Sequence, residues 1–194
     1  MDWSQLVNEL RGAEYHRGVV TESSKPHRLA FDAGLTDDEI VRTERQYAFT
    51  FPPDLRAFLQ TALPKGDGFP DWRGGNRAQL GTWLDSPKEG VLFDVEEDDF
   101  WFEGWGVKPT SRNDALRAAG RFLDKVPRLI PIYGHRMMPC QPIEAGNPVL
   151  SIHQTDIICY GFDLEDYLRH EFDLPGRKPW PETARTVPFW SDLP

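Results

Sequence analysis

The sequence predicts an α+β fold in which helices pack against a mainly antiparallel sheet. Residues 128–160 contain short apolar runs rich in Ile, Val and Tyr, each bounded by turn residues such as Gly, Pro and Asn. Runs of this kind are typical of the strands of a meander. On either side of them, apolar residues recur three and four positions apart, which indicates amphipathic helices. We therefore expect a sheet built largely from residues 91–160, with helices of the N-terminal half and residues 163–172 packed against it.

The N-terminal half contains three predicted helices. The first lies within residues 1–15. The second begins after Thr36, a favourable N-cap, because Glu39 completes a capping box with it, and it ends near Tyr47. The third spans residues 53–62, since proline suits the first turn of a helix.

The middle of the chain, residues 64–112, is rich in glycine and proline and reads mainly as loops. Trp83 and Leu84 are expected to open a short helix that Pro87 stops, because proline in a helix interior removes a hydrogen bond. The apolar run 91–95 fits either a strand or a short helix.

The C-terminal half gives a clearer pattern. A helix is predicted over 111–125 and another over 163–172. The strands expected between them are 128–133, 137–142, 148–153 and 156–160. The joint at Thr155 is short enough for a tight hairpin. We divide the chain into a helical and irregular extension (1–33), a central domain (34–174) and a Pro- and Trp-rich tail (175–194), laid over the domain or partly mobile.

Charge limits the classes of partner. The 194 residues carry 22 basic and 31 acidic side chains, a net charge of −9. This balance argues against binding nucleic acid, which requires Lys and Arg to neutralise phosphates, and against anionic membranes. It is compatible with a basic protein partner, although acidity also simply keeps proteins soluble. The start of the chain lacks a basic and then apolar signal region, so we expect a cytoplasmic protein whose Cys140 and Cys159 are free thiols.

Two stretches resemble one protein family. The first contains Gly-Leu-Thr-Asp-Asp-Glu-Ile at 34–40 and Phe-Thr-Phe-Pro-Pro-Asp-Leu at 49–55. The second contains Pro-Ile-Tyr-Gly-His-Arg at 131–136, followed by the segments 146–161 and 163–172. In order and spacing they resemble the SUKH superfamily, which includes bacterial immunity proteins that neutralise toxins and fungal regulators of cell-wall assembly. The chain departs from the family pattern at the Gly-Gly pair, which stands later here, at 74–75.

An acidic run beside aromatic residues is the first candidate site. Its candidate partner-binding residues are Asp94, Glu96, Glu97, Asp98, Asp99, Trp101, Glu103 and Trp105. The resemblance implies carboxylates that imitate phosphates, flanked by aromatic anchors, as in immunity proteins that block basic nucleases. Both contact types are important at protein interfaces. The alternative is a solvated loop.

A polar cluster at the strand joints is the second candidate site. If the strands form a meander, Tyr133, His135, Arg136, His153 and Asp156 are neighbours and line a possible pocket. Simple polar pairing across the sheet is the alternative. The histidine spacings match no compact metal site, and no nucleophile elbow or phosphate loop is present. We predict no metal, no cofactor and no catalysis.

The function that these patterns favour is protein binding without catalysis. By resemblance, the chain is expected to act as an immunity protein that binds a toxin directly, with a basic toxin domain, such as a nuclease, as the partner. Two alternatives remain at this point. One is a regulatory or scaffold protein that binds an endogenous partner. The other is a small-ligand binder or an enzyme that uses the polar cluster at 133–156.

Overall fold

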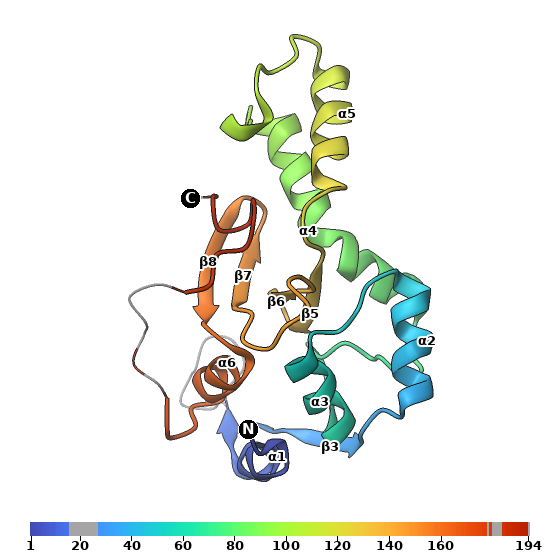
Figure 1. The fold of residues 1–194 in the computed structure, drawn as a ribbon, viewed down its shortest axis with the longest axis vertical. Helices are drawn as coiled ribbons and strands as arrows, with labels where there is room; N and C mark the ends of the chain where they lie inside the picture. Colours follow the sequence, from blue (N-terminus) through green and yellow to red (C-terminus); the bar gives the residue numbers. More distant parts are fainter. Residues whose placement is uncertain (16–26, 178, 180–183, 194) are drawn as a thin grey trace.

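The computed structural model describes residues 1–15, 27–177, 179 and 184–193 (Figure 1). The helices are α1 (Trp3–Gly12), α2 (Asp37–Tyr47), α3 (Pro53–Thr61), α4 (Arg77–Glu97), α5 (Arg112–Leu123) and α6 (Leu164–Glu171), with a 3₁₀ turn η1 (Glu103–Trp105). The strands are β1 (Glu14–Tyr15), β2 (His27–Arg28), β3 (Ala30–Ala33), β4 (Ala62–Lys65), β5 (Leu129–Tyr133), β6 (Arg136–Pro139), β7 (Val149–His153) and β8 (Asp156–Gly161).

The fold is α+β, as predicted. The main sheet has four antiparallel strands in the order β5-β6-β7-β8, so each strand pairs with its neighbour in the sequence. Two small antiparallel pairs, β1–β2 and β3–β4, lie outside it. The expectation that the main sheet begins near residue 91 is wrong. It begins at Leu129, and residues 91–97 belong to α4.

Local signals in the N-terminal half form the predicted elements. The Thr36 side chain accepts a hydrogen bond from the Glu39 backbone, and the Glu39 carboxylate accepts one from the Thr36 backbone, so the capping box is complete. Helix α3 begins at Pro53, where the missing N–H would have had no partner within the helix. The helix ends at Thr61, and the chain continues directly into β4, which contains Pro64.

Helix α4 is longer than the sequence suggests. Pro87 was expected to stop a short helix, yet it lies inside a helix of 21 residues. Proline leaves the carbonyl four residues earlier without its usual donor. Here that carbonyl belongs to Trp83, and the Ser86 hydroxyl donates to it at 2.8 Å. One neighbouring hydroxyl thus satisfies the backbone group that Pro87 leaves without a partner.

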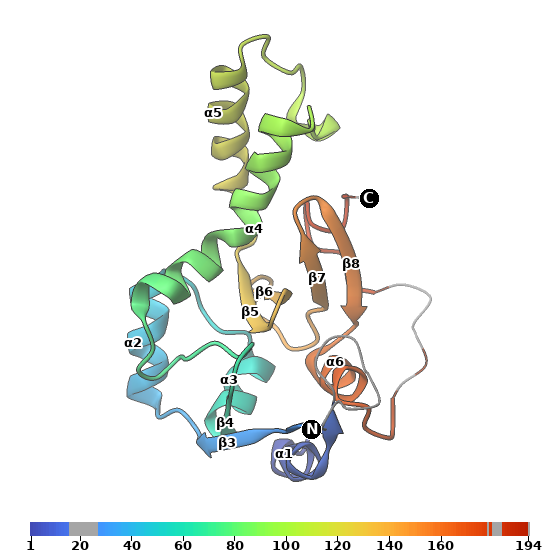
Figure 2. The same ribbon diagram turned by 180° about the vertical axis from the view of Figure 1, so that it is seen from behind.

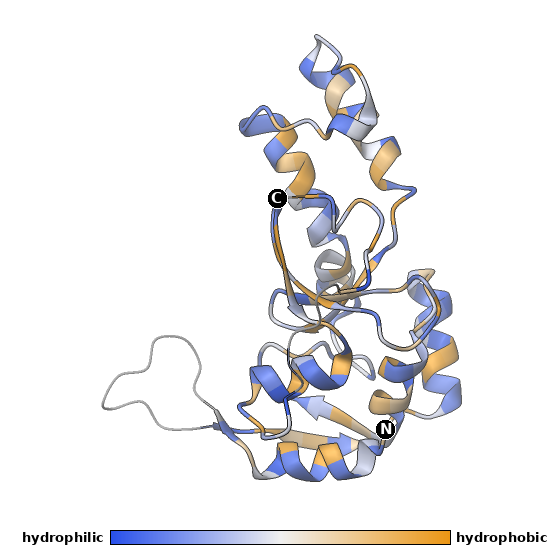
Figure 3. Ribbon diagram, turned by 60° about the vertical axis from the view of Figure 1, so that its left-hand side comes forward, coloured by the Kyte–Doolittle hydropathy of each residue, from blue (hydrophilic) through white to orange (hydrophobic). Residues whose placement is uncertain are grey.

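The second half of α4 and all of α5 form a helical hairpin that projects beyond the sheet (Figures 1 and 2). We call residues 88–126 the arm and residues 98–111 the arm tip. The remainder, with α1, α2, α3 and α6 around the lower end of the sheet, is the body. Apolar residues run along both helices of the arm (Figure 3).

Two hydrophobic cores hold these parts together. The first core joins α1, α2, α3, α6 and the start of α4 to the sheet, and includes Leu6, Ile40, Phe58, Leu84 and Tyr167. The second core joins the arm to the sheet, and includes Val91, Val95, Trp105, Leu123 and Leu150. Helix α4 contributes to both cores and therefore connects them.

Residues 184–193, which we call the strap, complete the second core. Val187, Phe189, Trp190 and Leu193 are buried in it. These ten residues pack on the domain, with a turn at residues 188–192. Trp180 falls outside the described residues. The segment boundaries at 33/34 and 174/175 stay predictions, although α1 packs into the first core and the strap into the second.

Candidate functional site

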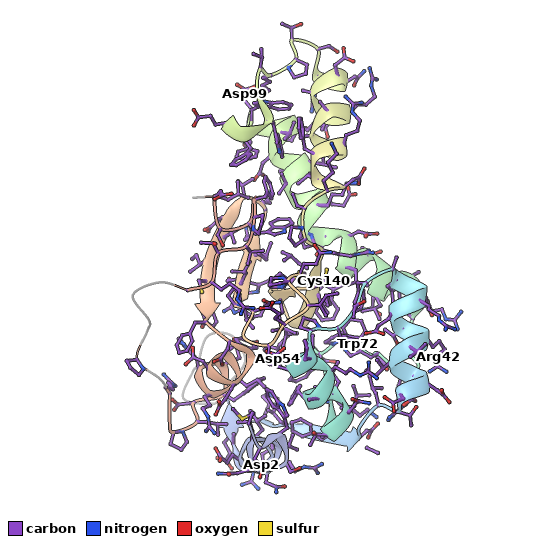
Figure 4. The ribbon with its side chains drawn as sticks, in the orientation of Figure 1. Asp2, Arg42, Asp54, Trp72, Asp99 and Cys140 are labelled. Atoms are coloured by element: carbon purple, nitrogen blue, oxygen red, sulfur yellow. The ribbon has the colours of Figure 1, made fainter. Side chains whose placement is uncertain are left out.

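The acidic and aromatic segment covers the end of α4 and the arm tip. Asp99 lies near the far end of the arm (Figure 4). Within the arm, seven acidic residues and one lysine occur from Lys88 to Gly106, whereas five basic and two acidic residues occur from Val107 to Val126. The two sides of the arm thus carry opposite charge.

Part of the predicted negative surface is paired within the chain. Arg112 at the start of α5 contacts the carboxylates of Glu96 at 3.1 Å and Glu97 at 2.6 Å. The Lys108 ammonium lies 2.6 Å from the Asp99 carboxylate. These groups are largely exposed, and ion pairs of that kind contribute little stability, about 0–1 kcal/mol. Their carboxylates therefore remain accessible to a competing cation.

Two of the predicted partner-binding residues are wrong for that role. Asp94 is 4% exposed, and its Oδ2 accepts hydrogen bonds from the Thr155 amide at 2.9 Å and the Thr155 hydroxyl at 2.6 Å. Trp105 is 8% exposed and stacks on Phe122, with 5.7 Å between ring centroids. The Asp94 side chain therefore attaches the arm to the sheet, and the Trp105 ring packs within the arm. The sequence pattern could not separate them from their exposed neighbours.

The exposed part of the arm tip is smaller than predicted and partly apolar. Asp98 and Glu103 are exposed, and neither has an ion pair with any other residue that the structure describes. Trp101 is half-buried, and its indole N–H donates to the Gly106 carbonyl at 2.7 Å. Val107 is 96% exposed and Phe93, on α4, is 49% exposed.

Sequence reasoning missed Val107 and Phe93. Phe93 sits in an apolar run that fits a strand as well as a helix, so the direction of its side chain was undetermined. In the helical register it lies on the side of α4 opposite to the buried Val91 and Val95. Val107 follows Gly106, whose φ of 78° places the chain in a conformation that glycine favours and that turns the backbone at the arm tip.

The sheet places members of the second predicted cluster opposite each other in pairs. Tyr133 is paired with Arg136 across β5 and β6, and His153 with Asp156 across β7 and β8. Arg136 is in turn paired with Ser151 across β6 and β7, so its side chain and that of Ser151 share one face. His135 precedes Arg136 in the β5–β6 turn.

Arg136 is the centre of this cluster, and its contacts are internal. Its guanidinium donates to the Ser151 hydroxyl at 2.7 Å and lies 3.7 Å from the centre of the Tyr160 ring. Its ion-pair partner is Glu171 of α6, at 3.4 Å, rather than Asp156. The Arg136 side chain is only 13% exposed. These contacts favour the polar-pairing interpretation of Arg136, which joins β6 to α6.

Burial shifts the pKa of one histidine and two cysteines in this part of the chain. Burial lowers the pKa of His135 below its usual 6.5, and the nearby Arg136 and His153 lower it further. His135 is therefore neutral at pH 7. Burial raises the pKa of the Cys140 and Cys159 thiols, so both stay protonated. Both cysteines are free, as the sequence predicts.

A cavity of about 440 Å³ lies elsewhere, between α4, the end of α5, the start of β5 and the residues just after β6. Leu84, Pro87, Leu129, Cys140 and Trp190 are among the residues that line it. None of the five residues of the predicted polar cluster lines it. Within the described part of the chain, no group of three or more His, Cys, Asp or Glu side chains is placed to hold a metal ion. None of the helices in that part has the length and apolar character needed to span a membrane.

Comparison of the chain with protein-family models, with curated proteins and with solved structures finds no match in any of the three.

Proposed function

We propose that the protein is a non-catalytic binding module that acts in the cytoplasm and neutralises a toxin by direct contact, as the resemblance to SUKH immunity proteins implies. The observation that supports this most is the arm. It projects from the body and ends in a small surface that combines carboxylates with exposed apolar side chains. A projecting hairpin reaches into a concave partner more easily than a flat face does.

The chemistry of the arm tip fits a basic partner. Asp98 and Glu103 offer carboxylates that form no ion pair with any described residue, and the 97% exposed Asp99 offers a weakly paired one. Val107 and part of the Trp101 ring supply apolar area on the same tip, and Phe93 supplies more on α4. A few aromatic or apolar anchors with complementary charges around them commonly provide most of the affinity of an interface.

The proposed mechanism is blockade. The carboxylates of the tip form ion pairs with the basic residues by which the toxin holds its own substrate. The apolar side chains of the tip slow dissociation of the complex. Electrostatic attraction between the two surfaces speeds association, so complex formation is expected to slow as salt concentration rises.

The test uses the toxin encoded by the adjacent gene. Cells that produce it are expected to survive when they also produce this protein, and a stable complex is expected on gel filtration. Asp98→Arg and Trp101→Ala are expected to weaken binding at least about tenfold, which is the usual effect of losing one important interface contact.

Glu89→Arg is the matched control, since Glu89 is an exposed acid on the same helix but farther from the tip. It makes the same charge change and is expected to leave binding within about twofold. Equal binding by wild type, Asp98→Arg and Trp101→Ala, each folded by circular dichroism, would place the interface elsewhere. A complete lack of protection and of complex would refute the proposed function itself.

A further inference from the structure

The strap is a small unit with its own internal hydrogen bonds. The Ser191 amide donates to the Val187 carbonyl at 2.9 Å, and the Ser191 hydroxyl accepts from the Val187 amide at 2.8 Å. Asp192 makes the same kind of reciprocal pair with Phe189, at 3.0 Å in each direction. Two side chains thus satisfy the backbone of the turn locally.

The strap touches the arm and the sheet at once. Phe189 stacks on Trp105 of the arm, with 5.6 Å between centroids and 11° between planes, and meets the edge of Phe102 at 5.2 Å. Trp190 donates its indole N–H to the Pro127 carbonyl, at 2.7 Å, where the arm returns to the sheet. Arg185 donates to the Asn147 side chain, at 2.7 Å, just before β7.

Two cavities flank the strap at Trp190. Trp190 lines the cavity of about 440 Å³ beside α4 and α5. It also lines a second cavity of about 200 Å³ between the strap and Leu150, Ile157 and Cys159 of the sheet. Trp190 is buried, at 3% exposed, and forms part of the wall of both cavities. Four buried apolar side chains, together with the hydrogen bonds described above, offset the entropy of ordering ten residues.

The backbone of the strap is also strained at its key contact. Phe189 has φ of 70°, in the left-handed region that bulky residues rarely adopt. Such a conformation persists only where surrounding contacts enforce it, and here the aromatic stack on Trp105 does so. Release of the strap would relieve this strain.

We propose that the strap is a releasable clamp. In the closed state it holds the arm against the sheet, and its detachment frees the arm and uncovers the rings of Phe102 and Trp105 while the first core stays folded. The separation of the two cores supports this, because all four buried strap residues belong to the second core. The inference concerns motion of the arm and does not depend on the identity of any partner.

Hydrogen exchange of the full-length protein tests the clamp. In the wild type, strap amides are expected to exchange at least about tenfold faster than amides of β7, because the strap opens without global unfolding. Trp190→Ala is expected to speed exchange in α5 and η1 by a similar factor and to leave α2 and α3 unchanged. Asp192→Ala removes a turn cap without touching the core and is expected to act in the same direction.

Leu10→Ala, in the first core, is the control. It is expected to speed exchange of the body amides, which shows that the measurement detects destabilisation of the body. If the strap and β7 exchange at the same rate, the strap opens only with the whole protein and the proposal is wrong. It is equally wrong if Trp190→Ala and Asp192→Ala speed exchange in the arm and body alike, or in neither.

Discussion

The carboxylate of Asp94 on α4 accepts two hydrogen bonds from Thr155 in the β7–β8 turn, one from its amide and one from its hydroxyl. Four residues earlier on the same helix, Gly90 passes the same turn so closely that a β-carbon there would lie 3.0 Å from the Gln154 Cα. Trp83, earlier still, donates to the Gly134 carbonyl of the β5–β6 turn at 3.1 Å. One face of α4 thus fixes both hairpin turns of the sheet.

Replacing Asp94 tests the strength of this attachment. Asp94→Ala removes the carboxylate that accepts from the half-buried Thr155 amide and hydroxyl, and losing these hydrogen bonds to a charged acceptor is expected to lower the free energy of unfolding by about 1–3 kcal/mol. Urea unfolding measures it. Asp98→Ala, an exposed acid one turn farther on, is the control and is expected to change stability by less than about 0.5 kcal/mol. Equal effects would mean that the hydrogen bonds to Thr155 contribute nothing net.

Two glycines of α4 give opposite predictions for the same substitution. Gly81 has no neighbouring heavy atom within 4 Å of an added β-carbon, so Gly81→Ala is expected to stabilise the helix by about 0.5–1 kcal/mol. Gly90→Ala gains the same propensity but pushes the helix away from Gln154, and we expect it to lower the melting temperature. If both variants raise it equally, α4 does not press on the turn.

The pH dependence of stability has one clear contributor. Arg73 forms an ion pair with Glu39 at 2.7 Å and, with the capping hydrogen bond to Thr36, lowers the pKa of Glu39 from 4.5 to about 2. A carboxylate with a lowered folded-state pKa contributes stability that is present above pH 4.5 and is lost as pH falls towards 2. Glu39→Gln retains a capping side chain but cannot ionise, so its stability is expected to fall less steeply over that window.

The measurement is urea unfolding at several pH values between 2 and 7, for wild type and Glu39→Gln. Glu89→Gln, which removes an exposed acid of α4, serves as the reference. Parallel curves for wild type and Glu39→Gln would contradict the assigned role of the Glu39–Arg73 pair.

The two sides of the sheet predict contrasting alanine substitutions. Leu150 is buried in the second core, so Leu150→Ala is expected to cost about 2–5 kcal/mol of stability. Ile158 on the neighbouring strand is 56% exposed, and Ile158→Ala is expected to cost less than about 1 kcal/mol, since little of that side chain leaves water on folding. Thermal unfolding of both variants distinguishes the faces, and similar losses would contradict the observed orientation.

Short-range signals explain what the sequence could predict. The Thr36–Glu39 capping box and the Asp163 cap involve residues three apart, so their chemistry is readable directly. The turn at Thr155 likewise follows from a local pattern. The prediction that Pro87 stops the helix is wrong because the Ser86 hydroxyl donates to the carbonyl that proline leaves without its usual partner. Asp94 and Trp105 misled because their partners, Thr155 and Phe189, lie 61 and 84 positions away.

The same limit applies to the polar cluster. The meander pattern predicts the strand order, and the observed sheet pairs Tyr133 with Arg136 and His153 with Asp156 because neighbouring strands pair in sequence order. It could not predict that Glu171 of α6 would take Arg136 as its ion-pair partner, since that depends on where the helix docks.

Helix α4 bends between its two halves (Figures 1 and 2), and this has a mechanical consequence. Leu80 and Leu84 anchor its first half in one core, and Val91 and Val95 anchor its second half in the other. A sideways force on the far end of the hairpin would therefore rotate the arm as a lever. The pivot would lie where Gly90 and Asp94 contact the β7–β8 turn. Force applied at Asp99 would reach the Trp83–Gly134 contact before it reached any residue of α1.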